Sequence, residues 1–327
     1  ALVLTEGDYW PLLLREAARR GVPVVVVNGR VGDRSFARMR RLRRFLGPVL
    51  GPVFDPIGRF GVQTEGDADR LLELGVPEER ITVTGNLKYD SPEPPPLPEL
   101  EERLLAVAAG RPLLVAGSTM AGEEAQVLEA FRAAGGGSRA LLILAPRHPE
   151  RWGEAVERVV AAGFRLVLRS GFGRGGDGGE SAAEGSDRGG SDRSRAGEGG
   201  PAAEVVLLDS LGELAAVYRL AAAAFIGGTL VPTGGHNPLE AALWGVPLAV
   251  GPSMTSFREM AADFDSRGAW VRVEDARALG RTWSRWLDDP DEARRIGGRA
   301  RLLVAENRGA LARTIEMLRP IVEGIET

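Results

Sequence analysis

The sequence contains no cysteine, which excludes disulfides, thiolate nucleophiles and cysteine-ligated zinc together. Its only histidines are His148 and His236, so a histidine-rich metal site is excluded as well. No segment approaches the roughly 18 uninterrupted apolar residues of a membrane-spanning helix, and we therefore expect none. The net charge of −4 argues against a nucleic-acid-binding protein. Lysine is nearly absent too: Lys88 is the single lysine among 41 basic residues.

What the sequence does contain is a regular alternation of short apolar runs and helical patterns. Helices are expected near residues 10–20, 34–46 and 65–75, and over most of the C-terminal end. Strands are expected at residues 1–5, 22–28, 59–64, 81–84, 112–117, 140–145, 164–169, 204–208, 222–227, 247–250 and 269–273. This order predicts an α/β fold with parallel sheets that helices cover on both faces. The length of 327 residues suits about two such domains.

A proline-rich segment marks the predicted boundary between the domains. Five of the eight residues from 91 to 98 are proline, so residues 89–98 should form a semi-rigid linker between domains at 1–88 and 99–327. Residues 171–200 hold 12 glycines and 4 serines, which predicts a disordered surface insertion. Because Ala1 already lies in a strand pattern, we also expect a fragment that lacks its N-terminal portion.

The segment at residues 225–240 is the strongest candidate for a binding site. It runs from an apolar strand through four glycines and His236 to Asn237 and Pro238, which favour a helix start. The glycines allow close approach to the backbone, and a helix N-terminus suits a phosphate. Glu240, three residues after Asn237, can accept hydrogen bonds from a ribose diol. The alternative is a glycine-rich turn with a capping asparagine and no ligand.

Three other loops follow predicted strands in the same way. Arg147 places a cation after the strand at 140–145, Ser210 is expected to cap a helix after 204–208, and small residues at 117–119 open another helix. Open α/β sheets bind ligands at the carboxyl ends of their strands, where such loops share one edge. The four loops together therefore predict a nucleotide-sugar site.

Further motifs accompany the glycine loop. They are Thr-Glu-Gly-Asp-Tyr-Trp-Pro at 5–11, Val-Asn-Gly-Arg at 27–30, Arg-Ser at 34–35, Val-Thr-Gly-Asn-Leu-Lys at 83–88, Ala-Pro-Arg-His-Pro at 145–149 and Gly-Pro at 251–252. In this order, and over nearly the whole chain outside 171–200, they resemble the 3-deoxy-D-manno-octulosonic acid (Kdo) transferases of lipopolysaccharide assembly. The resemblance implies a GT-B glycosyltransferase, with two Rossmann-like domains and the active site in the cleft between them. It also implies inverting transfer of Kdo from CMP-Kdo to a lipid A precursor, without metal or cofactor, by a peripheral protein at the cytoplasmic face of the bacterial inner membrane.

The resemblance assigns roles to individual residues. It implies that Glu6 and Lys88 stabilise the transition state, and that the general base lies before Ala1. One departure is Gly-Asp at 7–8, before Tyr9, where the family pattern has Thr-Glu. CMP is expected to contact Pro146, Arg147, Leu211, Gly212, Glu213, Asn237, Pro238, Leu239 and Glu240. Arg147 can balance charge that develops on the CMP phosphate, and Lys88 supplies a compact ammonium. The alternatives are a plain helix cap at Glu6 and an unspecialised surface residue at Lys88.

A basic stretch follows the second predicted strand. Residues 30–46 contain seven arginines, among them Arg30, Arg34, Arg38 and Arg41. Apolar residues at positions 36, 39, 42 and 46 fall on one face, which predicts a basic amphipathic helix. Such a helix suits an anionic surface, either bilayer headgroups or the phosphates of a lipid A precursor. The alternative is a core-packed helix with a solvated basic face.

Two other functions stay open at this point. A GT-B enzyme that uses a UDP-sugar, either a transferase or an epimerase, would carry similar loops, as would a donor-binding remnant without its general base. Asp263 and Asp265 match the metal-binding Asp-x-Asp motif of other glycosyltransferases, but they fall in a helical stretch. For them we predict a solvated helix face.

Overall fold

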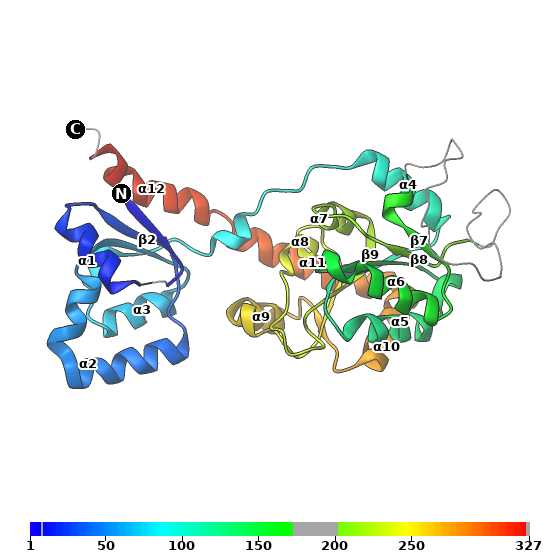
Figure 1. The fold of residues 1–327 in the computed structure, drawn as a ribbon, viewed down its shortest axis with the longest axis horizontal. Helices are drawn as coiled ribbons and strands as arrows, with labels where there is room; N and C mark the ends of the chain where they lie inside the picture. Colours follow the sequence, from blue (N-terminus) through cyan, green and yellow to red (C-terminus); the bar gives the residue numbers. More distant parts are fainter. Residues whose placement is uncertain (8, 173–201, 325–327) are drawn as a thin grey trace, which may run out of the picture. The chain divides into compact units, whose positions relative to one another are not determined.

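The computed structural model describes residues 1–7, 9–172 and 202–324, and the chain forms two compact units (Figure 1). The first unit consists of Ala1–Pro92 and Val304–Thr327, and the second of Glu93–Leu303. The sequence predicts a single division at 89–98, with all later residues in one domain, whereas the C-terminal helix here returns to the first unit. From residue 173 on, the predicted insertion at 171–200 lies outside the described residues.

Within the described residues, the first unit is built on four parallel strands in the order β1-β2-β3-β4. Its elements are β1 (Leu2–Thr5), α1 (Pro11–Arg19), β2 (Val24–Gly29), α2 (Asp33–Phe54), β3 (Ile57–Val62), α3 (Glu65–Glu73) and β4 (Ile81–Val83). Every residue of β2 is buried. A strand inside a covered parallel sheet has no solvent face, which explains its unbroken run of four valines.

The described part of the second unit has a seven-stranded parallel sheet in the order β11-β10-β9-β5-β6-β8-β7. Its strands are β5 (Leu113–Thr119), β6 (Leu141–Pro146), β7 (Leu166–Leu168), β8 (Val205–Leu207), β9 (Ala221–Ile226), β10 (Leu248–Val250) and β11 (Val271–Arg272). The chain starts at β5 in the middle, runs outward through β6, and returns to β9 on the other side of β5. The order therefore reverses between β5 and β9, and open α/β sheets bind ligands at such a switch point.

Helices accompany this sheet, and of them α5 and α6 contact its strands directly (Figure 1). They are α4 (Pro98–Ala108), α5 (Glu123–Ala133), α6 (Trp152–Ala161), α7 (Leu214–Val217), α8 (Leu239–Ala242), α9 (Arg258–Arg267), α10 (Ala276–Asp288) and α11 (Pro290–Asn307). Phe131 of α5 and Trp283 of α10 are fully buried in the core. At Gly280 an added Cβ would lie 2.8 Å from the Ala133 side chain, so glycine lets α10 pack directly on α5.

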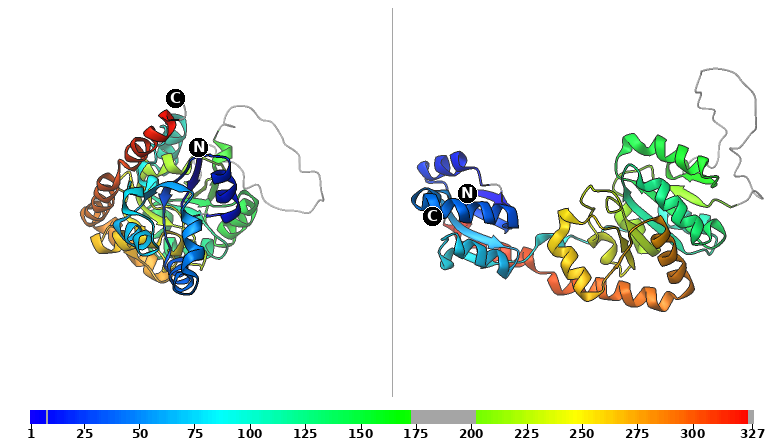
Figure 2. Two further views of the ribbon diagram at one scale, coloured as in Figure 1. Left: turned by 90° about the vertical axis from the view of Figure 1, so that its left-hand side faces the viewer. Right: turned by 90° about the horizontal axis from the view of Figure 1, so that it is seen from below.

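The last helix, α12 (Ala310–Glu323), is tied to the first unit by hydrogen bonds. The Asp90 carboxylate accepts from the backbone N–H groups of Gly309 and Leu311, at 2.7 and 2.6 Å. The Arg313 guanidinium donates to the carbonyl oxygen of Thr84 at 2.8 Å. Two further views show α12 beside the first unit (Figure 2). Asp90 therefore connects the end of the first unit's N-terminal segment to its C-terminal helix.

The predicted strands are confirmed, because each expected region contains an observed strand. The helix predicted at 34–46 is longer than expected and continues to Phe54. None of the described helices has both the length and the apolar character needed to cross a membrane.

The linker predicted at 89–98 is shorter than expected. Tyr89 and Asp90 belong to a 3-10 turn, η2 (Leu87–Asp90), and Tyr89 is buried. Pro98 is the first residue of α4. Proline fits that position because the first N–H of a helix needs no partner inside the helix. The connection without helix or strand is therefore limited to residues 91–97.

Candidate functional site

The loops that the sequence singled out share one edge of the second sheet. They follow β9, β5, β6 and β8, which are consecutive neighbours and parallel. The loops after β5 and β9 flank the point at which the strand order reverses. The predicted gathering at one sheet edge is thus confirmed, and it coincides with the place where a ligand crevice forms in this kind of sheet.

The first half of the glycine loop binds an internal carboxylate. Glu123, at the start of α5, is 0% exposed. It accepts hydrogen bonds from the N–H groups of Gly228 at 2.6 Å and of Thr229 and Leu230 at 2.9 Å each, and also from Met120 at 2.9 Å. Burial raises the pKa of the Glu123 carboxyl, and these four backbone bonds oppose the rise. The N–H groups of this part of the loop therefore face Glu123, not a ligand.

The glycines themselves are explained in part by packing. A Cβ on Gly227 would lie 2.2 Å from the carbonyl oxygen of Ser118, at the end of β5. Gly234 and Gly235 have positive φ angles of 95° and 80°, which favour glycine. Packing therefore accounts for Gly227, whose hydrogen atom lets two neighbouring strand ends meet.

The helix start predicted with Asn237 as the cap is one residue too early, because Pro238 is the N-cap of α8 and Leu239 its first residue. The Asn237 side-chain oxygen accepts from the N–H of Leu239 at 3.1 Å. The helix that follows, α8, is only 4 residues long. So short a helix has few aligned peptide dipoles, and the prediction that its N-terminus stabilises a phosphate is therefore not supported. Pro238 and Leu239 are buried.

Charged and titratable side chains from two of these loops influence one another at this edge, Arg147 after β6 and His236 and Glu240 after β9. Arg147 is exposed after β6. Burial raises the pKa of the Glu240 carboxyl, and the positive charge of Arg147 opposes this rise. Burial also lowers the pKa of the His236 imidazole, and Arg147 and His148 lower it further. Arg147 thus lies within electrostatic reach of both Glu240 and His236. The His236 Nε2 atom is buried, and the described part of the chain offers it no hydrogen-bond partner.

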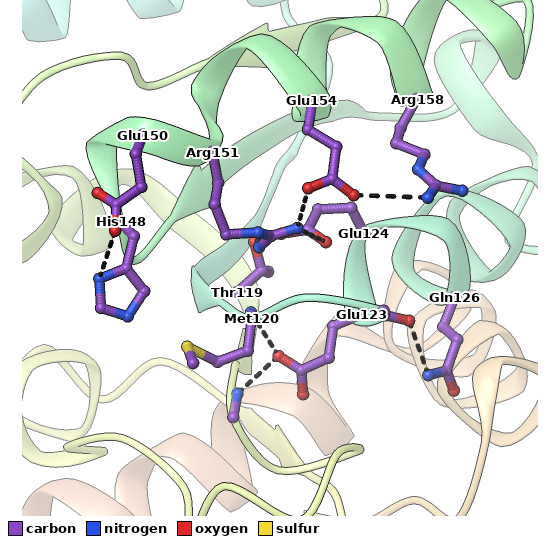
Figure 3. A network of polar contacts seen from close by, with 12 residues as sticks. Thr119, Met120, Glu123, Glu124, Gln126, His148, Glu150, Arg151, Glu154 and Arg158 are labelled. Carbon is purple, nitrogen blue, oxygen red and sulfur yellow. Dashed lines mark hydrogen bonds and ion pairs between the residues drawn. The ribbon is translucent and has the colours of Figure 1, made fainter.

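A second buried acid fixes the loop that carries Arg147 (Figure 3). Glu124, whose side chain is 2% exposed, binds both terminal nitrogens of Arg151 at 2.6 and 3.0 Å. It also accepts from the Thr119 hydroxyl at 3.1 Å. Arg151 follows Arg147 by four residues, and the Arg147 N–H donates to the Thr119 carbonyl oxygen at 2.9 Å. This network holds the end of β6 against the end of β5. The sequence analysis missed Glu123 and Glu124, although both begin the helix after the small-residue loop at 117–119.

The loop after β8 uses its own carboxylate for structure. Arg169 donates to both oxygens of Glu213 at 2.8 and 2.6 Å. Burial alone would raise the pKa of the Glu213 carboxyl, but the bonds from Arg169 and Ser210 more than offset this and lower it. Ser210 was predicted to be a helix cap; that is wrong, because its hydroxyl bonds to Glu213 and α7 begins only at Leu214. Between them, Leu211 is 72% exposed and Gly212 has a φ of 83°.

In the first unit, the structure brings together the two predicted catalytic residues. Lys88 Nζ lies 3.1 Å from Glu6 Oε1. Glu6 follows β1, and Lys88 lies in η2 after β4, so the pair joins loops from two different strand ends. Both side chains are about half exposed, at 50% and 41%. An ion pair this exposed contributes little to stability.

The basic residues of α2 are placed as an amphipathic helix requires. Arg34, Arg38 and Arg41 are exposed, whereas Phe36 and Met39 pack against the core of the first unit. Leu42 is the exception, since it is 38% exposed. Arg30 is half-buried after β2, and the predicted core residue at position 46 lies outside the described side chains. Both predictions for this helix, an anionic partner and a solvated basic face, fit this geometry.

The predicted Asp-x-Asp segment lies on helix α9. Asp265 binds Arg272 at 2.8 Å and accepts from the Trp270 indole at 2.7 Å, while Asp263 is exposed. Phe264 between them is fully buried. Within the described residues, no three acidic, histidine or cysteine side chains gather as metal ligands would.

Two comparisons with known proteins match the chain to the same family. The sequence pattern of the family described as 3-Deoxy-D-manno-octulosonic-acid transferase (kdotransferase) matches residues 1–91. The 3-deoxy-D-manno-octulosonic acid transferase of Bordetella pertussis is 33% identical over 323 residues, which is 97% of this chain and 68% of that protein.

Solved structures resemble the chain as well. The C-terminal CMP-Kdo binding domain of WaaA from Acinetobacter baumannii is 26% identical, with a TM-score of 0.51 over 63% of this chain and 98% of that domain. Anabaena Alr3699/HepE in complex with UDP is 10% identical, with a TM-score of 0.56 over 98% of this chain and 79% of that one. At that identity the second likeness concerns the fold alone.

Proposed function

The chain belongs to the 3-deoxy-D-manno-octulosonic acid (Kdo) transferase family and has its GT-B fold, and from this premise we propose that it transfers Kdo from CMP-Kdo to a lipid A precursor. The protein is a glycosyltransferase. In the proposed reaction the anomeric centre is inverted and neither a metal ion nor a cofactor takes part. The donor assignment draws support from the Acinetobacter domain, which is described as CMP-Kdo binding.

The observation that carries the proposal is the arrangement of the loops that hold Arg147, His236 and Glu240, which follow β6 and β9 on the two sides of β5. Cleavage of the sugar–phosphate bond leaves negative charge on the CMP phosphate. Arg147 is exposed there and can form a charge-assisted hydrogen bond to that phosphate. Glu240 is assigned to the ribose hydroxyls. Arg147 thus supplies positive charge of the kind that a metal ion supplies in other transferases.

The remaining donor residues are assigned by their exposure. Leu211 and Gly212 are exposed and can touch the nucleotide. Pro146, Pro238 and Leu239 are buried, so they act by shaping the backbone of their loops. Glu213 and Asn237 hold their loops by the hydrogen bonds described above.

The first unit is assigned to the acceptor and to the transition state. Positive charge develops at the anomeric carbon, and the Glu6 carboxylate can orient groups around it, while the Lys88 ammonium 3.1 Å away can stabilise an anionic group. Exposed Arg34, Arg38 and Arg41 on α2 would meet phosphates of the acceptor or of anionic headgroups. This would place the enzyme as a peripheral protein at the cytoplasmic face of the inner membrane.

Calorimetric binding of CMP and cytidine tests the donor assignment. Arg147→Ala should weaken CMP by about ten- to a hundredfold and leave cytidine nearly unchanged, because a hydrogen bond to a charged group contributes roughly 1.5–3 kcal/mol. Glu240→Ala should weaken both ligands alike, since both carry the ribose. Arg277→Ala is the matched control, because Arg277 is exposed on α10.

Three results would contradict the assignment. Equal losses of CMP and cytidine on Arg147→Ala would mean that Arg147 only shapes its loop. Loss of CMP binding in EDTA would contradict the metal-free reaction. Tighter binding of UMP or UDP than of CMP would favour a UDP-sugar enzyme.

A further inference from the structure

Two residues at neighbouring strand ends of the first unit have a left-handed backbone. Glu6, after β1, has a φ of 63°, and Asn28, in β2, has a φ of 53°. This region is disfavoured for residues other than glycine, and asparagine tolerates it better than most. Such conformations persist where the surroundings fix them, and they gather at functional sites.

The backbone on either side of Asn28 holds Glu6. The Glu6 N–H donates to the carbonyl oxygen of Val27 at 3.0 Å, and the Arg30 N–H donates to the carbonyl oxygen of Glu6 at 3.1 Å. Both main-chain groups of Glu6 are therefore bonded to residues that flank Asn28.

The side chain of Asn28 reaches the other partner of the pair. Its Oδ1 atom accepts from the N–H of Leu87, the residue before Lys88, at 2.9 Å. Asn28 is 6% exposed, and its own carbonyl oxygen accepts from the Gln63 side-chain amide at 3.0 Å. Asn86 completes the turn, because its side-chain oxygen accepts from the Lys88 N–H at 3.0 Å.

We propose that Asn28 is a positioning residue for the Glu6–Lys88 pair. Its left-handed backbone presents the flanking groups that hold Glu6, and its amide oxygen holds the turn that carries Lys88, so one buried side chain sets the 3.1 Å contact between carboxylate and ammonium. The consequence for catalysis rests on the proposed function, because the pair is assigned there to the transition state. The positioning itself is a property of the fold and can be measured without substrate.

The single lysine of the 327-residue chain makes this measurement direct, since isotope-labelled lysine gives one NMR signal set. Asn28→Gly keeps a φ of 53° accessible and removes only the amide. We expect it to shift the Lys88 side-chain signals to the position of a mobile lysine, as Glu6→Gln should also do. Asn28→Asp keeps the acceptor oxygen and should keep the wild-type signals. Asn237→Gly is the matched control, because it removes another asparagine oxygen that accepts one backbone N–H, but in the second unit.

A second variant removes the same hydrogen bond from the donor side. Leu87→Pro deletes the N–H, and it suits the site because Leu87 begins the 3-10 turn and Asn86 before it is extended, with a ψ of 114°. It should shift the Lys88 signals as Asn28→Gly does. Unshifted Lys88 signals in either folded variant would overturn the proposal.

Kinetics separate this proposal from the proposed function. In the whole enzyme, Asn28→Gly should lower kcat by roughly ten- to a hundredfold, a range typical of small misplacements, with CMP affinity unchanged within about twofold. Added to Lys88→Met, it should cost little more, because both changes act on one pair. Full additivity would overturn the proposal. If Lys88→Met retains full kcat while the NMR shifts occur, the catalytic role of the pair fails and the positioning by Asn28 stands.

Discussion

Replacing Glu123 by alanine should destabilise the second unit far more than replacing Glu129, an exposed acid on the same helix. The Glu123 carboxylate is fully buried and accepts four backbone N–H groups, three of them from the glycine loop. Alanine leaves those four donors without an acceptor in a site that the folded chain closes to water.

The magnitude follows from this count. An unsatisfied buried donor costs roughly 1–3 kcal/mol, so four donors give an upper range of roughly 4–12 kcal/mol. Removing the buried charge offsets several kcal/mol of that cost, because a carboxylate taken out of water carries a desolvation penalty of that order. We therefore expect a net loss of about 3–5 kcal/mol in the free energy of unfolding. That is a large fraction of the roughly 5–15 kcal/mol that stabilises a typical domain.

Urea unfolding followed by tryptophan fluorescence suits this measurement, because five of the six tryptophans lie in the second unit. Glu129→Ala should change the stability by no more than about 0.5 kcal/mol. CMP affinity should fall in the folded fraction of Glu123→Ala, since the glycine loop loses its anchor. A loss of stability below about 1 kcal/mol for Glu123→Ala would refute the reasoning, because the loop would then not depend on the carboxylate.

Two further predictions concern the same sheet edge. Arg151→Met should destabilise the second unit by about 3 kcal/mol in urea unfolding, because it leaves Glu124 charged and buried, whereas Arg158→Met on the exposed face should change little; equal effects would contradict this. Burial and the charge of Arg147 lower the pKa of His236, so the unfolded chain binds a proton at higher pH than the folded chain does, and stability should fall as pH falls below about 6.5. Between about pH 8 and pH 5, the melting temperature of His236→Gln should fall less than that of the wild type. Equal falls in the two proteins would show that His236 does not contribute.

The positions of the strands could be predicted because the information is local. A short valine-rich run bounded by glycine, proline or charge has few alternatives, and each of the expected strand regions contains a strand. The boundary errors have the opposite origin. Tyr89 lies in a proline-rich neighbourhood but is buried in the turn η2, which the distant helix α12 contacts.

For Glu6 and Lys88, the family resemblance was enough to select two residues that lie together in the structure. Motif matches selected both residues, and the structure brings their side chains to 3.1 Å. No local pattern identifies Asn28 as the link between them, because its bond to Leu87 spans 59 positions. The same holds for Glu123, whose bonds to the glycine loop span 105 to 107 positions.

The sequence alone determined the α/β class, the alternation of strands and helices, and the loops at the ends of the strands. These depend on short apolar runs bounded by glycine, proline or charge and on the 3.6-residue period of helices, which neighbours in the chain define. Only the tertiary structure decided the strand order that makes β5 and β9 neighbours, and the return of α12 to the first unit. It also decided which acids are buried, because a carboxylate such as Glu123 enters a core only where backbone N–H groups from another strand end meet it. No local sequence pattern predicts these hydrogen bonds, because the packing of whole elements brings the carboxylate and the N–H groups together.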